Sequence, residues 1–204
     1  PVIQQPAEDR AVFQSSSGGK STAGEEISAY AIKFLNVSTG TPDANDIAVT
    51  KDGTSLFVSD GKLRKIVKLK KDYNDFKVEK SFSVDAGSKA PALATEEFLF
   101  ITLDEAKKLI YVLDTAKKKI YTLDYNGKKG ADIIADDGLL TTARSLRLSP
   151  EGTELYVANP AGNRVAALST ANGRITLDYA KAGKAQGDLA QPCFFMKDSA
   201  GNYH

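Results

Sequence analysis

The sequence is poor in the residue types that most often build reactive centres. Its 204 residues include one histidine, one cysteine, one methionine and no tryptophan. Because the histidine, His204, stands last, we expect neither a hydrolase triad built on an internal histidine nor a histidine-rich zinc site. A single cysteine, Cys193, excludes an internal disulfide and a cluster of thiolate metal ligands.

The sequence also lacks an excess of either charge and any long apolar run. Lysine and arginine number 27, aspartate and glutamate 26, and the formal net charge is +1, whereas nucleic-acid-binding domains usually carry a clear basic excess. No stretch approaches the roughly 20 apolar residues that a helix needs to span a bilayer. We therefore predict no nucleic-acid partner and no membrane span. The start at Pro1 is typical of a processed form or an excised fragment.

The sequence contains an internal repeat. Three stretches align without gaps: SLFVSDGKLRKIVKL from Ser55, LIYVLDTAKKKIYTL from Leu109 and ELYVANPAGNRVAAL from Glu154. They share an aromatic column (Phe57, Tyr111, Tyr156), an Asp/Asn column (Asp60, Asp114, Asn159) and a basic column (Lys65, Lys119, Arg164). A fourth copy begins at PCFFMKDSAGNYH, residues 192–204, with Tyr203 in the aromatic column.

Each unit alternates apolar and polar residues and is interrupted by turn clusters, a pattern that predicts strands and hairpins rather than helices. We expect four strands per unit, at 46–50, 55–60, 64–70 and 77–84 in the first and at 145–149, 154–159, 164–169 and 174–180 in the third. The predicted class is all-β, a β-propeller built of four-stranded antiparallel blades. A β-sandwich is the alternative, although it would not require the gapless columns.

These motifs resemble known propeller repeats. The stretch SPEGTELYVANPAGNRVAALSTANG (149–173) is similar to the YVTN repeat. DIAVTKDGTSLFVSDGKLRKIVKL (46–69) and GDLAQPCFFMKDSAGNYH (187–204) resemble the NHL repeat. The resemblance implies a ring of six or seven blades. It extends to the gluconolactonase-like superfamily, whose calcium-dependent lactonases bind a metal near the propeller axis through carboxylates and an asparagine.

The predicted organisation is an N-terminal segment, residues 1–45, followed by propeller repeats at about 46–95, 96–143, 144–190 and 191–204, the last partial. The segment contains an outer strand and a flexible loop at 15–26, whose GGKST stretch lacks the first glycine and the following helix of a phosphate-binding loop. Residues 11–16 and 27–37 could complete the blade begun at Pro192 and close a four-bladed ring. Otherwise the chain is part of a six- or seven-bladed propeller, because an open propeller exposes sheet edges.

Two groups of residues are candidate sites. Asp60, Asp114 and Asn159 follow the second strand of each unit, and we expect their side chains to accept hydrogen bonds from their own turns rather than to form a ring of ligands. Residues that break the repeat near the innermost strands are predicted to line the central channel: Asp46, Glu96, Glu97, Arg144 and Asp188, with Gln191 beside the last. Calcium would suit such oxygen ligands, but their mixed charge predicts no particular metal or other cofactor.

The strand at 64–70 alternates basic and apolar residues (Arg64, Lys68, Lys70 against Ile66, Val67, Leu69). An anionic partner such as a polysaccharide, a phospholipid surface or RNA could bind it. We favour the interpretation that lysines on an outer strand block edge-to-edge pairing.

Three functional hypotheses follow from these patterns. The first is a non-catalytic propeller module, extracellular or periplasmic, that presents loops to a protein or a small polar ligand. The second is a calcium-dependent lactonase with its site in the channel. The third is a structural subunit whose open edges serve self-assembly or receive a complementary chain.

Overall fold

The computed structural model describes residues 41, 43–73, 75–84, 98–135, 137–180, 182–183, 188–198 and 201–204, which form three four-stranded antiparallel sheets. The first holds β1 (Ala44–Val49), β2 (Ser55–Asp60), β3 (Lys65–Asp72) and β4 (Asp75–Ser83). The second holds β5 (Leu99–Asp104), β6 (Leu109–Asp114), β7 (Lys119–Asp124) and β8 (Lys129–Ala135). The third holds β9 (Ser145–Leu148), β10 (Glu154–Asn159), β11 (Arg164–Ser169) and β12 (Ile175–Ala180). The prediction of four antiparallel strands per unit is confirmed.

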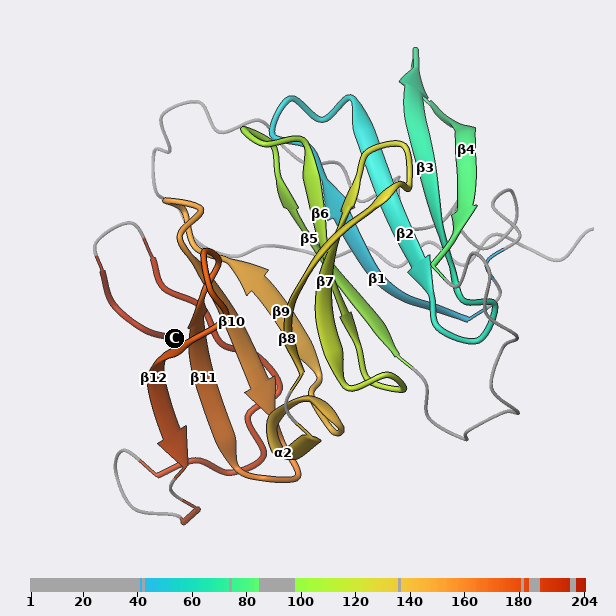
Figure 1. The fold of residues 1–204 in the computed structure, drawn as a ribbon. Coiled ribbons are helices and arrows are strands. Elements are labelled where there is room, and N and C mark those ends of the chain that lie inside the picture. The colour runs from blue at the N-terminus through green and yellow to red at the C-terminus, as the bar shows by residue number, and fades with distance from the viewer. Residues whose placement is uncertain are drawn as a thin grey trace, which may run out of the picture.

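The sheets stand side by side, and the strands of each follow one another in chain order (Figure 1). The first strands lie next to one another, with β5 between β1 and β9. We call β1, β5 and β9 the inner strands. Among the described residues, no helix is long and apolar enough to cross a membrane.

The hairpin between the second and third strands repeats in every sheet. The strands pair through Asp60 and Lys65, Asp114 and Lys119, and Asn159 and Arg164. The residue before each third strand is left-handed, with φ of 50° at Arg64, 52° at Lys118 and 44° at Asn163. Such values are uncommon outside glycine. The shared loop length therefore imposes the same turn on three different residue types.

The hydrophobic core lies between the sheets. At the first interface, between the first and second sheets, Phe57 and Ile66 pack with Leu99 and Ile101 in one buried cluster. The second interface, between the second and third sheets, buries twelve residues in another cluster: Phe100, Tyr111, Leu113, Ile120, Leu139, Leu140, Ala143, Leu146, Leu155, Val157, Ala166 and Leu168. Phe57 and Tyr111 of the aromatic column face the following sheet, whereas Leu99 and Ile101 of β5 and Leu146 of β9 face the preceding one. This explains why both faces of the second sheet are apolar.

One helical turn, α2 (Asp137–Leu140), connects β8 to β9. It places Leu139 and Leu140 in the second interface, where both are fully buried. Four residues are too few to carry a periodic apolar stripe, and the sequence pattern did not predict this helix.

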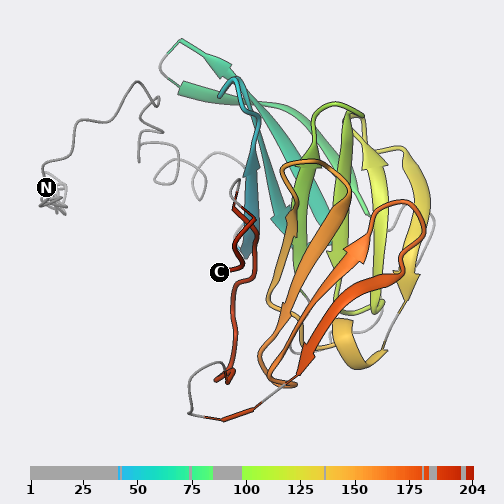
Figure 2. The same cartoon turned by 90° about the vertical axis from the view of Figure 1, so that its left-hand side faces the viewer.

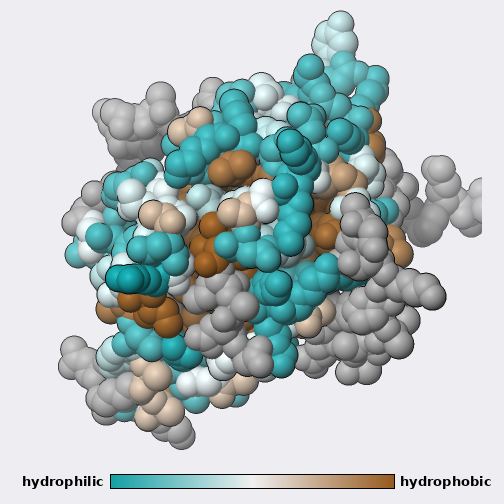
Figure 3. Space-filling model, in the orientation of Figure 1, coloured by the Kyte–Doolittle hydropathy of each residue, from teal (hydrophilic) through white to brown (hydrophobic). Residues whose placement is uncertain are grey.

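The C-terminal segment, residues 188–198 and 201–204, packs on the third sheet rather than forming a full sheet of its own (Figure 2). Phe195 is buried and its ring lies 5.4 Å from that of Tyr156. Residues 196–198 pair with residues 202–204, and Tyr203 lies opposite Lys197. Hydrophobic surface lies beside the end of the chain (Figure 3).

The placement of Tyr203 in the aromatic column is wrong. Phe57, Tyr111 and Tyr156 pair with Ala48, Thr102 and Arg147, nine residues earlier, whereas Tyr203 pairs with Lys197, six residues earlier. The shorter turn shifts the register and turns the Tyr203 ring back toward Tyr156, at 6.2 Å. A shift of one residue moves a side chain to the other face of its strand.

The predicted loop at 15–26, the predicted strands at 11–16 and 27–37, and the candidates Glu96 and Glu97 lie outside the described residues. Closure of a four-bladed ring by the N-terminal segment therefore stays a prediction.

Candidate functional site

The Asp/Asn column occupies one position in three equivalent turns. Asp60 Oδ1 accepts a hydrogen bond from the Leu63 N–H at 2.7 Å, and Asp114 Oδ1 accepts one from Lys117 N–H at 3.0 Å. Asn159 Oδ1 accepts one from Gly162 N–H at 2.9 Å. All three side chains are buried. Each therefore stabilises its own turn, an arrangement typical of Asx turns.

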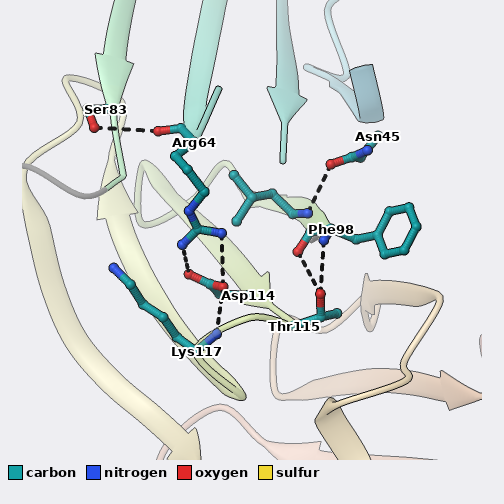
Figure 4. Close-up of polar contacts among 8 residues, drawn as sticks. Asn45, Arg64, Ser83, Phe98, Asp114, Thr115 and Lys117 are labelled. Carbon is teal, nitrogen blue, oxygen red and sulfur yellow. Dashed lines mark hydrogen bonds and ion pairs between the residues drawn. The ribbon is translucent and has the colours of Figure 1, made fainter. Parts of the chain in front are cut away.

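One member of the column also joins two sheets. Arg64 extends from the first sheet to Asp114 of the second, with a 3.1 Å hydrogen bond from Nη1 to Oδ1 and a shorter ion pair through Nη2 (Figure 4). The Arg64 and Asp114 side chains are 4% and 0% exposed. A buried pair of this kind holds the first interface in register, because separating it would leave a charge without compensation.

Asn159 takes the equivalent position at the second interface but bonds to different groups. Its Nδ2 donates to the carbonyl oxygens of Gly138 at 3.1 Å and Leu139 at 2.8 Å, which belong to α2. Its Oδ1 also accepts a hydrogen bond from the Thr142 hydroxyl at 2.8 Å. Asp114 thus connects two sheets, Asn159 anchors the segment that leads into the third sheet, and the buried oxygens of the column are not presented to a ligand.

The basic column and the basic strand are largely paired with acids. Arg164 makes two 2.8 Å hydrogen bonds to Asp178, and Lys68 lies 2.7 Å from Glu79. The strand at 64–70 corresponds to β3, which pairs with β2 on one side and β4 on the other. The interpretation that its lysines protect an exposed edge is therefore wrong, since β3 is an interior strand.

Asp46 lies at the point where the inner strands meet. Its Oδ1 accepts a hydrogen bond from Ile47 N–H at 2.9 Å, and its Oδ2 accepts one from Ile101 N–H of β5 at 3.0 Å. Arg147 of β9 reaches across β5 and donates from Nη1 to the same Oδ2 at 3.3 Å. Burial raises the pKa of Asp46, although the Arg147 charge opposes this shift. One carboxylate therefore links all three sheets.

Arg147 is the accessible member of this group. Its side chain is 37% exposed, against 10% for Asp46. Its two hydrogen bonds to described residues both use Nη1, to Asp46 and to the Leu146 carbonyl oxygen at 2.7 Å. The guanidinium carbon lies 5.7 Å from the ring centroid of Phe194, in the C-terminal segment. We call Asp46, Arg147 and Phe194 the inner-strand cluster.

Arg147 and Phe194 were not among the site residues predicted from the sequence. A signal was present, because Arg147 stands between the paired apolar residues Leu146 and Leu148. The corresponding residues of the first two units are Ala48 and Thr102. A charged residue at a position otherwise small or uncharged breaks the repeat, which is the criterion that selected Asp46.

The other predicted channel residues do not join this cluster in any contact that the structure describes. The Arg144 guanidinium stacks on the Phe98 ring, 4.3 Å from its centroid, and donates to the Ala143 carbonyl oxygen. Asp188 lies against Gly183, where a Cβ atom would collide with its carboxylate. Within the described part of the chain, no three His, Cys, Asp or Glu side chains gather closely enough to hold a metal ion.

Comparison with known proteins identifies the architecture. Hydrazine synthase of Kuenenia stuttgartiensis superposes with a TM-score of 0.57 at 15% identity, over 88% of this chain and 44% of that one. A Bacteroides uniformis protein proposed to be a 6-phosphogluconolactonase gives 0.55 at 16%, over 78% and 45%. A virginiamycin B lyase from Staphylococcus aureus gives 0.53 at 15%, over 81% and 49%. The fold is a β-propeller.

The described sheets are three of its blades. The chain spans less than half the length of each of these solved structures, and identities this low establish the fold and no activity. No protein-family profile and no curated protein matches the sequence. The NHL and YVTN resemblance therefore remains a prediction.

Proposed function

We propose that the chain is a non-catalytic β-propeller module whose inner-strand cluster binds a polar ligand through a carboxylate group. The observation that carries this proposal is the half-exposed Arg147 beside Phe194. A guanidinium presents a planar set of donors that matches a carboxylate. Asp46 and the Leu146 carbonyl oxygen both accept from Nη1, and we assign the other guanidinium donors to the ligand.

Phe194 supports the same chemistry. An exposed aromatic ring next to an arginine offers a flat apolar surface on which the rest of a ligand can lie, while the cation takes its charged end. Asp46 is a poor candidate for the metal ligand of a lactonase, because two backbone N–H groups and Arg147 already bond its oxygens. The lactonase and assembly hypotheses have no observation that favours them over binding. A protein partner carrying an acidic residue would use the same contact, and an extracellular or periplasmic location stays a prediction.

The test is calorimetric titration of the full chain with citrate, at constant ionic strength set with sodium chloride. We expect saturable binding that weakens by about tenfold or more in Arg147→Gln, since a charge-assisted pair contributes more than a neutral hydrogen bond. Arg174→Gln is the matched control, because Arg174 is exposed in a hairpin turn of the third sheet. An equal loss of citrate affinity in both variants would mean that the effect comes from the change in net charge and not from the position of Arg147. Absence of any saturable heat with citrate would contradict the proposal.

A further inference from the structure

The guanidinium of the inner-strand cluster already has an internal counterion. Asp46 Oδ2 accepts a hydrogen bond from Arg147 Nη1 at 3.3 Å and another from Ile101 N–H at 3.0 Å. The Asp46 side chain is almost buried, whereas that of Arg147 is partly exposed. An anion that reaches the guanidinium from solvent therefore shares this cation with a buried carboxylate.

The groups that surround Asp46 come from three strands. β2 contributes the Ser59 hydroxyl, which donates to the Asp46 carbonyl oxygen at 3.3 Å, and β5 contributes the N–H of Ile101. β9 contributes Arg147, the one charged side chain in the described part of the chain that acts on the Asp46 carboxylate. Burial raises the pKa of Asp46, and the Arg147 charge opposes that rise. The protonation of Asp46 therefore depends on what else Arg147 is paired with.

Binding of an anion to Arg147 and protonation of Asp46 should favour each other. A second negative charge on the guanidinium repels the Asp46 carboxylate and weakens the ionic contact that lowers its pKa. Loss of the Asp46 charge in turn removes the internal counterion, which strengthens the attraction of Arg147 for an anion. The two effects are equal in free energy, because coupling between two binding equilibria is reciprocal.

We propose that the inner-strand cluster binds its anion together with a proton, which Asp46 takes up. The proton comes from solvent and adds to a carboxylate oxygen of Asp46, so that the bound anion and the proton leave the net charge of the site unchanged. This inference rests on the proposed function, because it concerns the same guanidinium. It adds that acidification strengthens binding, most of all for anions that stay charged in acid, such as sulfonates.

The test is calorimetric titration of the full chain with benzenesulfonate, whose sulfonate remains a monoanion in acid and whose ring can lie on Phe194. Titrations are made at about pH 7 and about pH 4, in buffers without carboxylate groups and at constant ionic strength. Circular dichroism at both pH values monitors the fold. We expect the affinity of the wild type to be about fivefold or more higher at the lower pH.

Asp46→Asn removes the carboxylate charge at every pH. At about pH 7 it should bind benzenesulfonate about fivefold or more tightly than the wild type does, and its affinity should change little on acidification. This comparison does not require the chain to be folded in acid. Asp43→Asn is the matched control, because Asp43 is an exposed carboxylate just before β1 that pairs with Lys62 at 3.3 Å. It should keep the affinity and the pH dependence of the wild type.

The outcomes separate this proposal from the proposed function. Absence of saturable binding of both citrate and benzenesulfonate would overturn the proposed function and proton coupling with it. Saturable binding that requires Arg147 but has the same affinity in the wild type and in Asp46→Asn would overturn proton coupling alone. Proton coupling is also overturned if Asp43→Asn strengthens binding as much as Asp46→Asn does, because the effect would then come from net charge.

Discussion

The two interfaces between the three sheets are built from the same repeat but are held together differently. At the first, Arg64 crosses to Asp114 as a fully buried ion pair. At the second, Asn159 takes the place of Asp114 and donates to two carbonyl oxygens of α2. Both side chains keep the same hydrogen bond to their own turn. The repeat therefore maintains the turn, while the contact across the sheets differs from one interface to the next.

The difference shows how a repeated fold tolerates variation. The turn needs one acceptor, which the Oδ1 atom of either Asp or Asn supplies. The other polar atom of the side chain, Oδ2 of Asp114 or Nδ2 of Asn159, can then bond to a group outside the turn. An ionised Asp requires a cation there, whereas Asn requires acceptors. The inner strands differ in the same way, because Asp46 Oδ2 accepts from Ile101 N–H at the first interface and Thr102 Oγ1 accepts from Leu148 N–H at the second.

The largest effect is expected from Arg64→Met. Removal of the cation leaves the buried Asp114 carboxylate without its partner and should lower the free energy of unfolding by about 3–5 kcal/mol, measured by urea denaturation. The double variant Arg64→Met/Asp114→Asn removes both charges but keeps the turn acceptor, and should recover most of the loss. A single variant that costs less than about 1 kcal/mol would mean that the first interface does not depend on the pair.

A smaller loss is expected at the second interface from Asn159→Asp. The change keeps the acceptor for Gly162 N–H but replaces two donors by an oxygen that faces the carbonyls of α2. We expect a loss of about 2–3 kcal/mol in the same assay. Asn163→Asp is the control, because the Asn163 side chain accepts a hydrogen bond from Gln191 N–H, a role that Asp can also fill. If the control were as costly, the donors of Asn159 would not explain the effect.

Tyr125→Phe should act in the opposite direction at the first interface. Its hydroxyl is buried and has no hydrogen-bond partner among the described residues, so removal should stabilise the chain by about 1 kcal/mol. Burial, and then the charges of Glu105 and Asp104, raise the pKa of Tyr125 to about 12 from 10.0. Because the folded state holds this proton more tightly, the wild type should lose stability relative to Tyr125→Phe as the pH rises from 10 toward 12. The exposed Tyr73 is the control, and Tyr73→Phe should leave both measurements unchanged.

The smallest expected effect concerns the pH dependence of the inner strands. Because burial raises the pKa of Asp46 above 3.8, its contribution to the free energy of unfolding falls as the pH rises from that value through the folded-state pKa. Unfolding of the wild type and Asp46→Asn across this range should show the variant gaining relative stability with rising pH. Thr102→Val, which removes the side-chain acceptor of Leu148 N–H at the second interface, should show no such pH-dependent difference. If the difference in unfolding free energy between the wild type and Asp46→Asn stayed constant with pH, the raised pKa of Asp46 would be refuted.

The strands and turns were predictable because their causes are local. The bounds of β2 and β10 agree with the expected 55–60 and 154–159, since alternation and turn residues act over a few positions. The partner of Arg64 lies 50 residues away, and Arg147 meets Asp46 across 101 residues. No spacing rule covers such contacts. The helical turn α2 and the shifted register of Tyr203 were missed because a four-residue helix and a shortened turn leave no periodic trace.

By itself, the sequence determined the strand order, the three equivalent turns and the sidedness of the apolar columns, because each depends on hydrogen bonds and alternation within a single hairpin. Only the tertiary structure decided which side chains of different sheets meet: Arg64 with Asp114, Asn159 with α2, and Arg147 with Asp46 and Phe194. The physical reason is that such contacts depend on how one sheet is rotated against the next. That rotation is set by the packing of the whole interface rather than by any single repeat unit.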